Sequence, residues 1–343
     1  MAVTVRDTTK NGDMWNEWAT LLNAAIFDAD AQQNDYDDLV KALANVQTSK
    51  RWGEKSTTIG GLGDFETKVE GADAAEDSFV EGYAKFMEHI TFAKSVLISK
   101  EMRDDNQIAE AKTKVVNLVQ AYKRTRAKFI SQALTSSVGA TKVMDFGGKT
   151  GIDIGTPDNV ALFNAAHPLK NAFSSGTTNI TQANLFTNEL GQDPTVINAL
   201  SNIMRNFKDD RGEVLGFDAD TLIIPGNRPA VERFAKAIIG SDGEVGGNKN
   251  DINTERGKWK LIVDYLWTPE TGNPYILMSS KANKELLATR FFNRTELDIE
   301  NEVKTESRNM LYNGFGRFIG GFTNWRHVIM GGSSDSSAET WSA

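Results

Sequence analysis

The stretch from Gly60 to Leu134 constrains this chain more than any other. A glycine-rich segment, Ile59-Gly-Gly-Leu-Gly-Asp-Phe65, passes through Phe79-Val-Glu-Gly-Tyr83 into one long amphipathic pattern over residues 104–134. Glycine at this density breaks helices and favours an extended excursion with loose turns. The excursion has too few apolar residues to fold alone, because an isolated hairpin is only marginally stable in water. We therefore expect it to reach into a neighbouring molecule, which makes self-assembly the leading question.

Residues 104–134 have the apolar periodicity of a single long helix. Asp104 or Asp105 can cap its start, and apolar residues then recur at steps of three and four positions. About thirty residues at 1.5 Å per residue span roughly 45 Å, which is longer than the average globular helix. We therefore predict one helix that extends well beyond a typical core element.

The opposite face of this predicted helix is cationic in an otherwise acidic protein. No Asp or Glu occurs between Glu110 and Asp145, whereas the basic residues there include Lys112, Lys114, Lys123, Arg124, Arg126 and Lys128. Two interpretations stay open. The face is solvated, or it meets the acidic residues of another subunit's glycine-rich segment, which are Glu66, Glu70, Asp73, Glu76 and Asp77. Single exposed ion pairs contribute only about 0–1 kcal/mol, so such matching would set register and partner choice more than affinity.

The N-terminal 48 residues alternate between apolar and acidic character. Helical spacing relates six of the apolar residues, which are Trp15, Trp18, Leu21, Leu22, Ala25 and Ile26. This segment is either the first helix of a small domain or an arm whose aromatic face docks on a partner. We favour the arm.

Residues 136–284 have the pattern of a compact mixed α/β lobe. Ala183–Phe207 is expected to be largely helical, and Thr221–Pro225 to be a buried strand. Pro229 lies where a proline can open the next helix. Trp259–Trp267 and Tyr275–Met278 flank a turn and are expected to pair as two strands. The polar, glycine-rich residues 240–250 are expected to form a mobile loop.

The last part of the chain returns to strand patterns. Charged residues alternate with Leu297, Ile299 and Val303, and an aromatic-rich apolar segment closes the fold over residues 315–330. The Ser-rich residues after 331 are expected to be disordered. The sequence shows no internal repeat and no clear linker between independent domains.

Composition narrows the possible functions. At 343 residues the chain exceeds a single typical core, which favours two lobes or long extensions. It has no cysteine, no apolar run long enough to span a membrane and no apolar signal-peptide core, which predicts an intracellular product. The net charge of −8 argues against a nucleic-acid reader with a basic surface, but not against a container for nucleic acid.

Catalytic and metal-binding signatures fail when their context is tested. Gly148-Lys-Thr150 lacks the first glycine of a P-loop, since position 143 is valine, and Asp145-Phe-Gly147 lacks the other parts of a kinase site. The three histidines, His89, His167 and His327, have no neighbour at a metal-ligand spacing. We therefore predict no catalytic, cofactor-binding or metal-binding residues, and a protein that is not an enzyme.

Taken in order, the segments from about residue 45 to 332 resemble the major capsid proteins of tailed phages, which have the HK97-like fold. Phe79-Val-Glu-Gly-Tyr83 through Asp105 is similar to the return of that family's extended loop into its spine helix. Ala161-Leu-Phe-Asn-Ala-Ala-His-Pro168 resembles a Phe-x-x-x-His-Pro element of Mu-like head subunits. Thr221–Pro229 resembles a strand-to-helix step of the axial domain, and Phe322–Val328 the closing strand of the peripheral domain.

The resemblance implies an α+β fold and a domain organisation in six segments. These are an N-terminal arm (1–48), an extended loop or E-loop (49–90), a peripheral or P-domain with spine helix 104–134 (91–180), an axial or A-domain (181–284), return strands of the P-domain (285–332) and a flexible tail (333–343).

The resemblance also implies a function. The chain would self-assemble into hexamers and pentamers of a phage head that encloses double-stranded DNA, contacted non-specifically. Its other partners would be a portal protein and separate scaffold or decoration proteins, with assembly in the host cytoplasm and no membrane. Because the resemblance begins within about fifty residues of Met1, any scaffold is expected to be a separate protein. Nothing identifies residues for covalent crosslinking.

The predicted assembly interface has two parts. Trp52, Ile59, Leu62 and Phe65 are expected at the tip of the arm-like loop, whereas Lys112, Arg124, Arg126 and Lys128 would contact a neighbour's arm or face the lumen. Two alternative functions remain. One is an encapsulin-like compartment that encloses enzymes in a shell of the same fold. The other is a soluble α/β enzyme with an unrecognised site.

Overall fold

The computed structural model describes most of the chain in two compact units. The described residues are 3–7, 15–32, 34–59, 65, 67–68, 70–71, 73, 76, 81–169, 181–191, 194–243 and 252–341. The first unit combines Met1–Glu54, Met87–Ile130 and Phe291–Gly320, and the second combines Lys55–Phe86, Ser131–Arg290 and Gly321–Ala343. Each unit is described by itself.

A long sheet forms the frame of the first unit. Its strand order is β1-β13-β14-β5, with β2 also paired to β13. The bounds of these strands are Thr4–Asp7 for β1, Asn45–Thr48 for β2, Ile90–Ile98 for β5, Thr289–Val303 for β13 and Met310–Phe322 for β14. β5 runs antiparallel to β14, and β1 runs parallel to β13.

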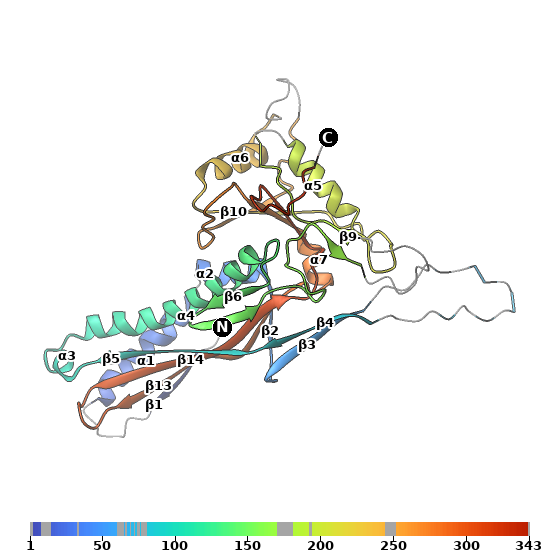
Figure 1. Ribbon diagram of the computed structural model, residues 1–343. Coiled ribbons are helices and arrows are strands. Elements are labelled where there is room, and N and C mark those ends of the chain that lie inside the picture. Colours follow the sequence, from blue (N-terminus) through green and yellow to red (C-terminus); the bar gives the residue numbers. More distant parts are fainter. Residues whose placement is uncertain are drawn as a thin grey trace. The chain divides into compact units, whose positions relative to one another are not determined.

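The predicted long helix is confirmed as α4, which spans Ile108–Ser136 and runs along the long strands in Figure 1. It begins four residues later than predicted, because residues Lys100–Asp104 form a separate short helix, α3, and Asn106 has a positive φ of 54°. Glycine lets the helix lie close to the sheet. A Cβ at Gly316 would lie 2.3 Å from the ring of Tyr122, which packs there.

The core of the first unit is aromatic. The ring of Phe318 in β14 stacks on Phe92 with centroids 4.5 Å apart and on Phe291 at 5.3 Å, while Phe129 of α4 approaches it edge-on at 5.7 Å. Alternation along the strand places Phe318 on the helix side of the sheet, whereas Phe315 is 43% exposed.

The N-terminal helices α1 (Asn16–Ala31) and α2 (Asp35–Leu43) pack within the first unit. Trp15, Leu22 and Ile26 are all at most 2% exposed, so the aromatic face is buried in its own chain. The predicted docking of this aromatic face on a partner is therefore wrong, because the chain's own first unit covers the face. Leu21 and Phe27, on the other side of α1, remain exposed.

A four-stranded sheet is the main frame of the second unit. Its order is β11-β10-β12-β15, with bounds Lys260–Asp264, Thr221–Pro225, Tyr275–Met278 and Val328–Gly331. The buried strand β10 is confirmed, as is α6, which spans Pro229–Gly240 and has its proline at the first turn. The predicted pairing of β11 with β12 is wrong. Both strands pair with β10 instead, β11 in parallel and β12 antiparallel.

Smaller elements complete the second unit. α5 spans Thr195–Arg205 and α7 spans Ser280–Glu285, so the helix predicted over 183–207 occupies only the second half of that range. Strands β6 (Val143–Phe146) and β7 (Lys149–Asp153) form a hairpin, and β8 (His167–Pro168) pairs with β9 (Thr181–Gln182). Gly148 lies in the turn of the β6–β7 hairpin, and Lys149 and Thr150 begin β7. Gly147 and Gly148 both have positive φ in this turn.

The C-terminal tail is anchored, contrary to the prediction of flexibility. The amide of Glu339 donates to the carbonyl of Leu185, and Thr187 donates back to Glu339. The amide of Trp341 donates to Asn188 Oδ1, whose Nδ2 donates to the Trp341 carbonyl. Most of the loop predicted over 240–250 lies outside the described residues. Among the described helices, none is long and apolar enough to cross a membrane.

Candidate assembly site

The predicted two-stranded excursion is present as the strands β3 (Gly53–Ile59) and β4 (Glu81–Glu88), which pair only with each other among the described strands. We call this pair, together with residues 60–80 that join its two strands in the sequence, the ribbon. Gly82 of β4 is required there, because a Cβ would overlap the side chain of Thr58. The side chain of Thr58 also donates to the carbonyl of Tyr83 at 3.1 Å, which fixes the two strands together.

Apolar side chains near the ribbon are exposed, as expected for a segment that a neighbour covers. Phe65 is fully exposed, Trp52 is 62% exposed and Phe86 of β4 is 46% exposed. The side chain of Ile59 and the whole of Leu62, the other two predicted contacts, lie outside the described residues. Of the acidic residues in this stretch, Glu70, Asp73 and Glu76 are exposed, whereas Glu66 and Asp77 also lie outside the described residues.

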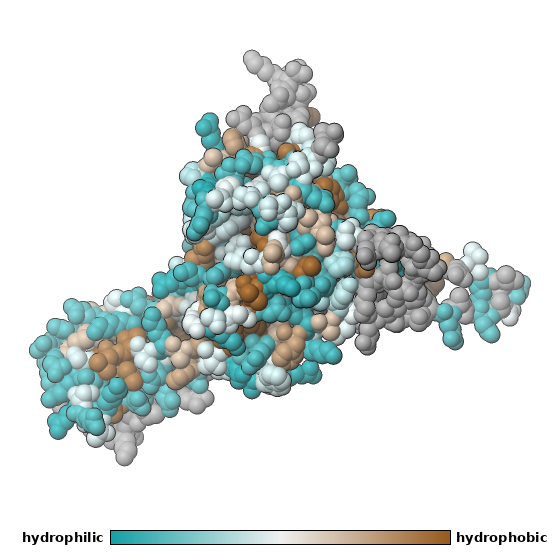
Figure 2. All heavy atoms as spheres, in the orientation of Figure 1, coloured by the Kyte–Doolittle hydropathy of each residue, from teal (hydrophilic) through white to brown (hydrophobic). Residues whose placement is uncertain are grey.

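The predicted cationic face of α4 is only partly a surface. Lys114, Arg124 and Lys128 are exposed and Lys112 is half-buried. Arg124 and Lys128 lie four positions apart, on one side of the helix. We call these four residues the basic stripe. Figure 2 shows a visible face on which hydrophilic residues predominate and hydrophobic residues form small patches.

Lys123 and Arg126, predicted on the same face, are instead buried at 1% and 5% exposure. The Lys123 ammonium donates to the carbonyls of Ala29 at 3.3 Å, Asp30 at 2.9 Å and Gln32 at 3.0 Å, and lies 3.5 Å from the Asp37 carboxylate. Arg126 lies 3.1 Å from the same carboxylate and donates to Asn293 Oδ1 at 3.4 Å. Arg126 is therefore corrected from an assembly contact to part of an internal lock that holds α1 and α2 on α4.

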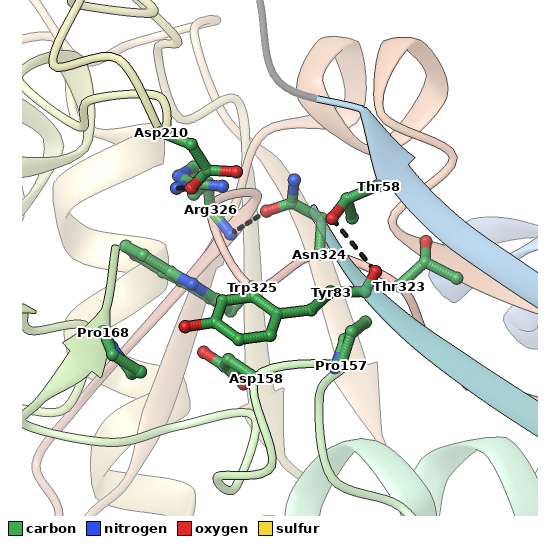
Figure 3. Close-up of a pocket in the computed structure, with 10 residues that line it drawn as sticks. All are labelled: Thr58, Tyr83, Pro157, Asp158, Pro168, Asp210, Thr323, Asn324, Trp325 and Arg326. Atoms are coloured by element: carbon green, nitrogen blue, oxygen red, sulfur yellow. Dashed lines mark hydrogen bonds and ion pairs between the residues drawn. The ribbon is translucent and has the colours of Figure 1, made fainter. Parts of the chain in front are cut away.

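The root of the ribbon borders a small pocket that the sequence did not reveal. Its lining, drawn in Figure 3, is Thr58, Tyr83, Pro157, Asp158, Pro168, Asp210, Thr323, Asn324, Trp325 and Arg326. In Figure 3 the Tyr83 ring lies across the pocket, with Asp158 beside it and Pro157 and Pro168 on either side. Burial raises the pKa of Tyr83, and the carboxylates of Asp158 and Asp210 raise it further. The pocket therefore joins the ribbon to three loops of the second unit.

Lys85 makes a second attachment of the ribbon. It is 5% exposed, and its ammonium lies 3.3 Å from the Asp153 carboxylate and also donates to the carbonyl of Gly155. Burial lowers the pKa of Lys85, and the nearby Asp153 carboxylate opposes this shift. The root is thus fixed by an internal ion pair, while the exposed apolar residues remain available to a partner.

No group of His, Cys, Asp or Glu residues that could hold a metal ion occurs in the described part of the chain. Asp145, part of the kinase-like triplet, accepts a hydrogen bond from the amide of Gly151 in its own hairpin. His327 is fully buried with Thr289 Oγ1 at 2.7 Å from Nε2, and burial lowers its pKa to about 3. These groups stabilise the fold.

Comparisons with known proteins agree with this structural reading. The model of a family described as phage capsid protein matches residues 82–330, which is more than half of the chain. A search of curated proteins found no match.

Solved structures give the fold. A structure from Mycobacterium phage Patience shares 12% identity, with 99% of this chain and 95% of that chain covered, and a TM-score of 0.52. The procapsid of bacteriophage JBD30 (11% identity, 95% and 77% covered, TM-score 0.49) and a virus-like particle from Pyrococcus furiosus (11% identity, 91% and 97% covered, TM-score 0.45) are less similar. The family match and the first structure confirm the predicted α+β, HK97-like capsid fold.

Proposed function

Because this chain belongs to the family of phage capsid proteins, we propose that it forms the hexamers and pentamers of a tailed-phage head that encloses double-stranded DNA. As a capsid protein it is a structural component of the virion and not an enzyme, and it assembles with copies of itself into a shell. The hexamers and pentamers, the DNA cargo and the other partners are the parts that we propose.

One observation carries the proposal beyond the family: a ribbon with a fixed root and exposed apolar residues. Lys85 and Tyr83 attach the root to the second unit, whereas Phe65 and Trp52 are exposed. Exposed aromatic residues on an extended segment are unfavourable in a free monomer, because their apolar surface stays in water. They are typical of a surface that a neighbouring subunit buries. When identical subunits bind through two different surfaces, each subunit is rotated relative to the last. The subunits form a closed ring if these rotations add up to a full turn.

We propose that the basic stripe supports this contact. Lys112, Arg124 and Lys128 would meet the acidic residues of a neighbour's ribbon, of which Glu70, Asp73 and Glu76 are exposed, or would face the lumen. Exposed pairs contribute little energy each, so the stripe would select register rather than supply affinity. A lumenal stripe would touch packaged DNA weakly and without sequence preference.

We also propose an assignment of the chain to the domains of a capsid protein. Residues 1–48 would be the N-terminal arm, here packed on its own chain, 49–90 the E-loop, 91–180 with 285–332 the P-domain, and 181–284 the A-domain. Portal, separate scaffold or decoration proteins would be the other partners, with assembly in the host cytoplasm. Purified particles that hold double-stranded DNA would support this function, whereas particles filled with an enzyme would favour the encapsulin-like alternative.

Replacing residues 60–80 by a short Gly-Ser turn tests the ribbon. The strands β3 and β4 and the contacts of Lys85 stay in place, so we expect a folded subunit that fails to form shells. Circular dichroism and size-exclusion chromatography would establish folding, and electron microscopy would score assembly. Shells of normal yield from this variant would refute the role of the ribbon.

Arg124→Glu combined with Lys128→Glu tests the basic stripe. If the stripe is an interface, assembly should fall and the loss should depend on salt concentration. The matched control is Lys281→Glu with Lys284→Glu, two exposed residues of α7 whose replacement changes the net charge equally. Equal assembly of the two variants at moderate salt would return the stripe to a solvated face.

A further inference from the structure

His167 is a buried histidine in which both ring nitrogens have hydrogen-bond partners. It is 0% exposed and lies in β8, directly before Pro168. Its Nδ1 is 2.8 Å from Asp158 Oδ2, and its Nε2 is 3.2 Å from the carbonyl oxygen of Leu162 and 3.2 Å from Asn184 Oδ1. The question is which of these nitrogens carries a proton.

The neighbours of Asn184 fix the orientation of its amide. Asn184 Nδ2 donates to the carbonyls of Leu162 at 2.8 Å and Val328 at 3.2 Å, while its Oδ1 accepts from the amide of Asn164 at 2.8 Å. The oxygen of Asn184 therefore faces His167, because a flipped amide would break three hydrogen bonds. The Nε2 atom of His167 thus faces two acceptors and no donor.

The Nδ1 atom also faces an acceptor, the carboxylate of Asp158. That carboxylate is fixed from the other side, because Asp158 Oδ1 accepts from the Thr156 hydroxyl and from the amide of Val160 at 3.5 Å. A neutral imidazole has one N–H and one lone pair, so it would place a lone pair against an acceptor on one side. Only the doubly protonated ring donates to all of its partners.

The charged groups around His167 are few and come from four elements. Asp158 lies on the loop before β8. Arg326 lies over the Trp325 ring, 5.0 Å from its centroid, and forms an ion pair with Asp210 at 2.9 Å. From β4, Tyr83 and Lys85 are within electrostatic range of Asp158. The Asp158 side chain is only 4% exposed, so it is the one buried anion that contacts the ring among the described residues.

The ring of His167 also supports the pocket at the root of the ribbon. It stacks on the indole of Trp325 with centroids 4.3 Å apart and an interplanar angle of 12°. Asp158, Trp325 and the adjacent Pro168 all line that pocket, where Tyr83 lies (Figure 3). The ring of His167 therefore contacts two residues of the wall that faces the ribbon, Asp158 and Trp325, and directly precedes a third, Pro168.

We propose that His167 is a buried imidazolium whose ion pair with Asp158 holds this part of the wall, and with it the root of the ribbon, in place. A neutral ring would leave either the Asp158 carboxylate or the Asn184 oxygen facing a lone pair. One of them would then have to move, and the wall would move with it. This latch does not depend on what the ribbon contacts in a shell.

The protonation state can be read directly by nitrogen-15 NMR of the full-length chain labelled at histidine. At neutral pH we expect His167 to show two protonated ring nitrogens. A spectrum with one protonated and one bare nitrogen at neutral pH would overturn the proposal. This measurement uses the wild-type protein, so it stands even if variants fold poorly.

Hydrogen exchange then tests the latch. In His167→Gln and in Asp158→Asn, amides of β3 and β4 should exchange about tenfold to a hundredfold faster than in the wild type, the range for a lost hydrogen bond to a charged group. The double variant should exchange less than the product of the two effects predicts, because it leaves no unpaired charge. The control is Thr181→Ala, an exposed residue of β9. Unchanged exchange in both single variants, or purely multiplicative effects, would overturn the latch.

Discussion

The substitution Lys123→Met removes the ammonium that holds the N-terminal helices to α4. The Lys123 side chain is 1% exposed and donates to three carbonyls at the end of α1 and beyond, with oxygen distances of 3.3, 2.9 and 3.0 Å. Methionine preserves most of the apolar stem, so the change isolates the charge and its hydrogen bonds. The variant leaves these carbonyls without their donor and reduces the partners of Asp37.

The expected loss of unfolding free energy depends on which contacts of Asp37 remain in the variant. Removing one member of a buried ion pair destabilises a protein by about 3–5 kcal/mol. Asp37 keeps Arg126 at 3.1 Å and its side chain is 14% exposed, so we expect the lower end, about 3 kcal/mol. The loss should concentrate in residues 16–43, since these helices depend on the lock.

Urea unfolding of the unassembled full-length chain, followed by tryptophan fluorescence, measures this loss. The control is Lys128→Met, which removes an exposed ammonium from the same helix and should change the free energy of unfolding by less than about 0.5 kcal/mol. If both variants lost the same stability, or Lys123→Met lost less than about 1 kcal/mol, the buried ammonium would not be the lock described here.

Two further predictions concern the buried groups. The pKa of His327 is about 3 in the folded chain against an ordinary value of 6.5, so protons bind more tightly to the unfolded chain and stability falls as pH drops below about 6.5. Between pH 7 and pH 5 the free energy of unfolding should fall by about 2 kcal/mol. The variant His327→Gln should lose less stability over this range, so parallel curves of unfolding free energy against pH for the two proteins would contradict the role given to His327. Phe318→Ala should destabilise the chain by about 3–5 kcal/mol, because its ring packs on Phe92 and Phe291. Phe315→Ala, at a 43% exposed position of the same strand, should cost less than about 1 kcal/mol, and equal losses in urea unfolding would mean that the aromatic cluster is not the core.

Local patterns predicted the elements well where the periodicity was long or the composition extreme. The apolar spacing after Asp104 gave α4, the apolar run Thr221–Pro225 gave β10, and the glycine density gave the ribbon. In each case the type of element follows from its own residues. The pairing of β11 with β10 could not be read in this way, because strand partners depend on contacts between remote segments.

The charges of α4 show the same limit at the candidate site. A lysine or arginine on a helix is usually solvated, and the sequence pattern alone does not distinguish the buried Lys123 from the exposed Lys128. The buried cations differ from the exposed ones in sharing the carboxylate of Asp37, which is 89 residues from Arg126 along the chain. The anchored tail is a similar case, since its partners are backbone groups of residues 185–187 and the side chain of Asn188, which is 153 residues from Trp341 along the chain.

The pocket at the root of the ribbon went unpredicted because its residues are ordinary one at a time. A histidine before a proline, as at His167, is typical of a turn, and Trp325 with Arg326 belongs to the pattern of the closing strand. The fold brings them together by stacking, at 4.3 Å between ring centroids. A buried His–Asp pair is recognisable only once both partners are placed in space.

The most direct test of the account is electron microscopy of the expressed full-length chain after size-exclusion chromatography, beside the variant that lacks residues 60–80. We predict closed shells, tubes or rings of capsomers for the wild type, and folded but unassembled subunits for the variant. A wild-type chain that stays a monomer even when it is produced together with the products of its neighbouring genes would contradict self-assembly as its function.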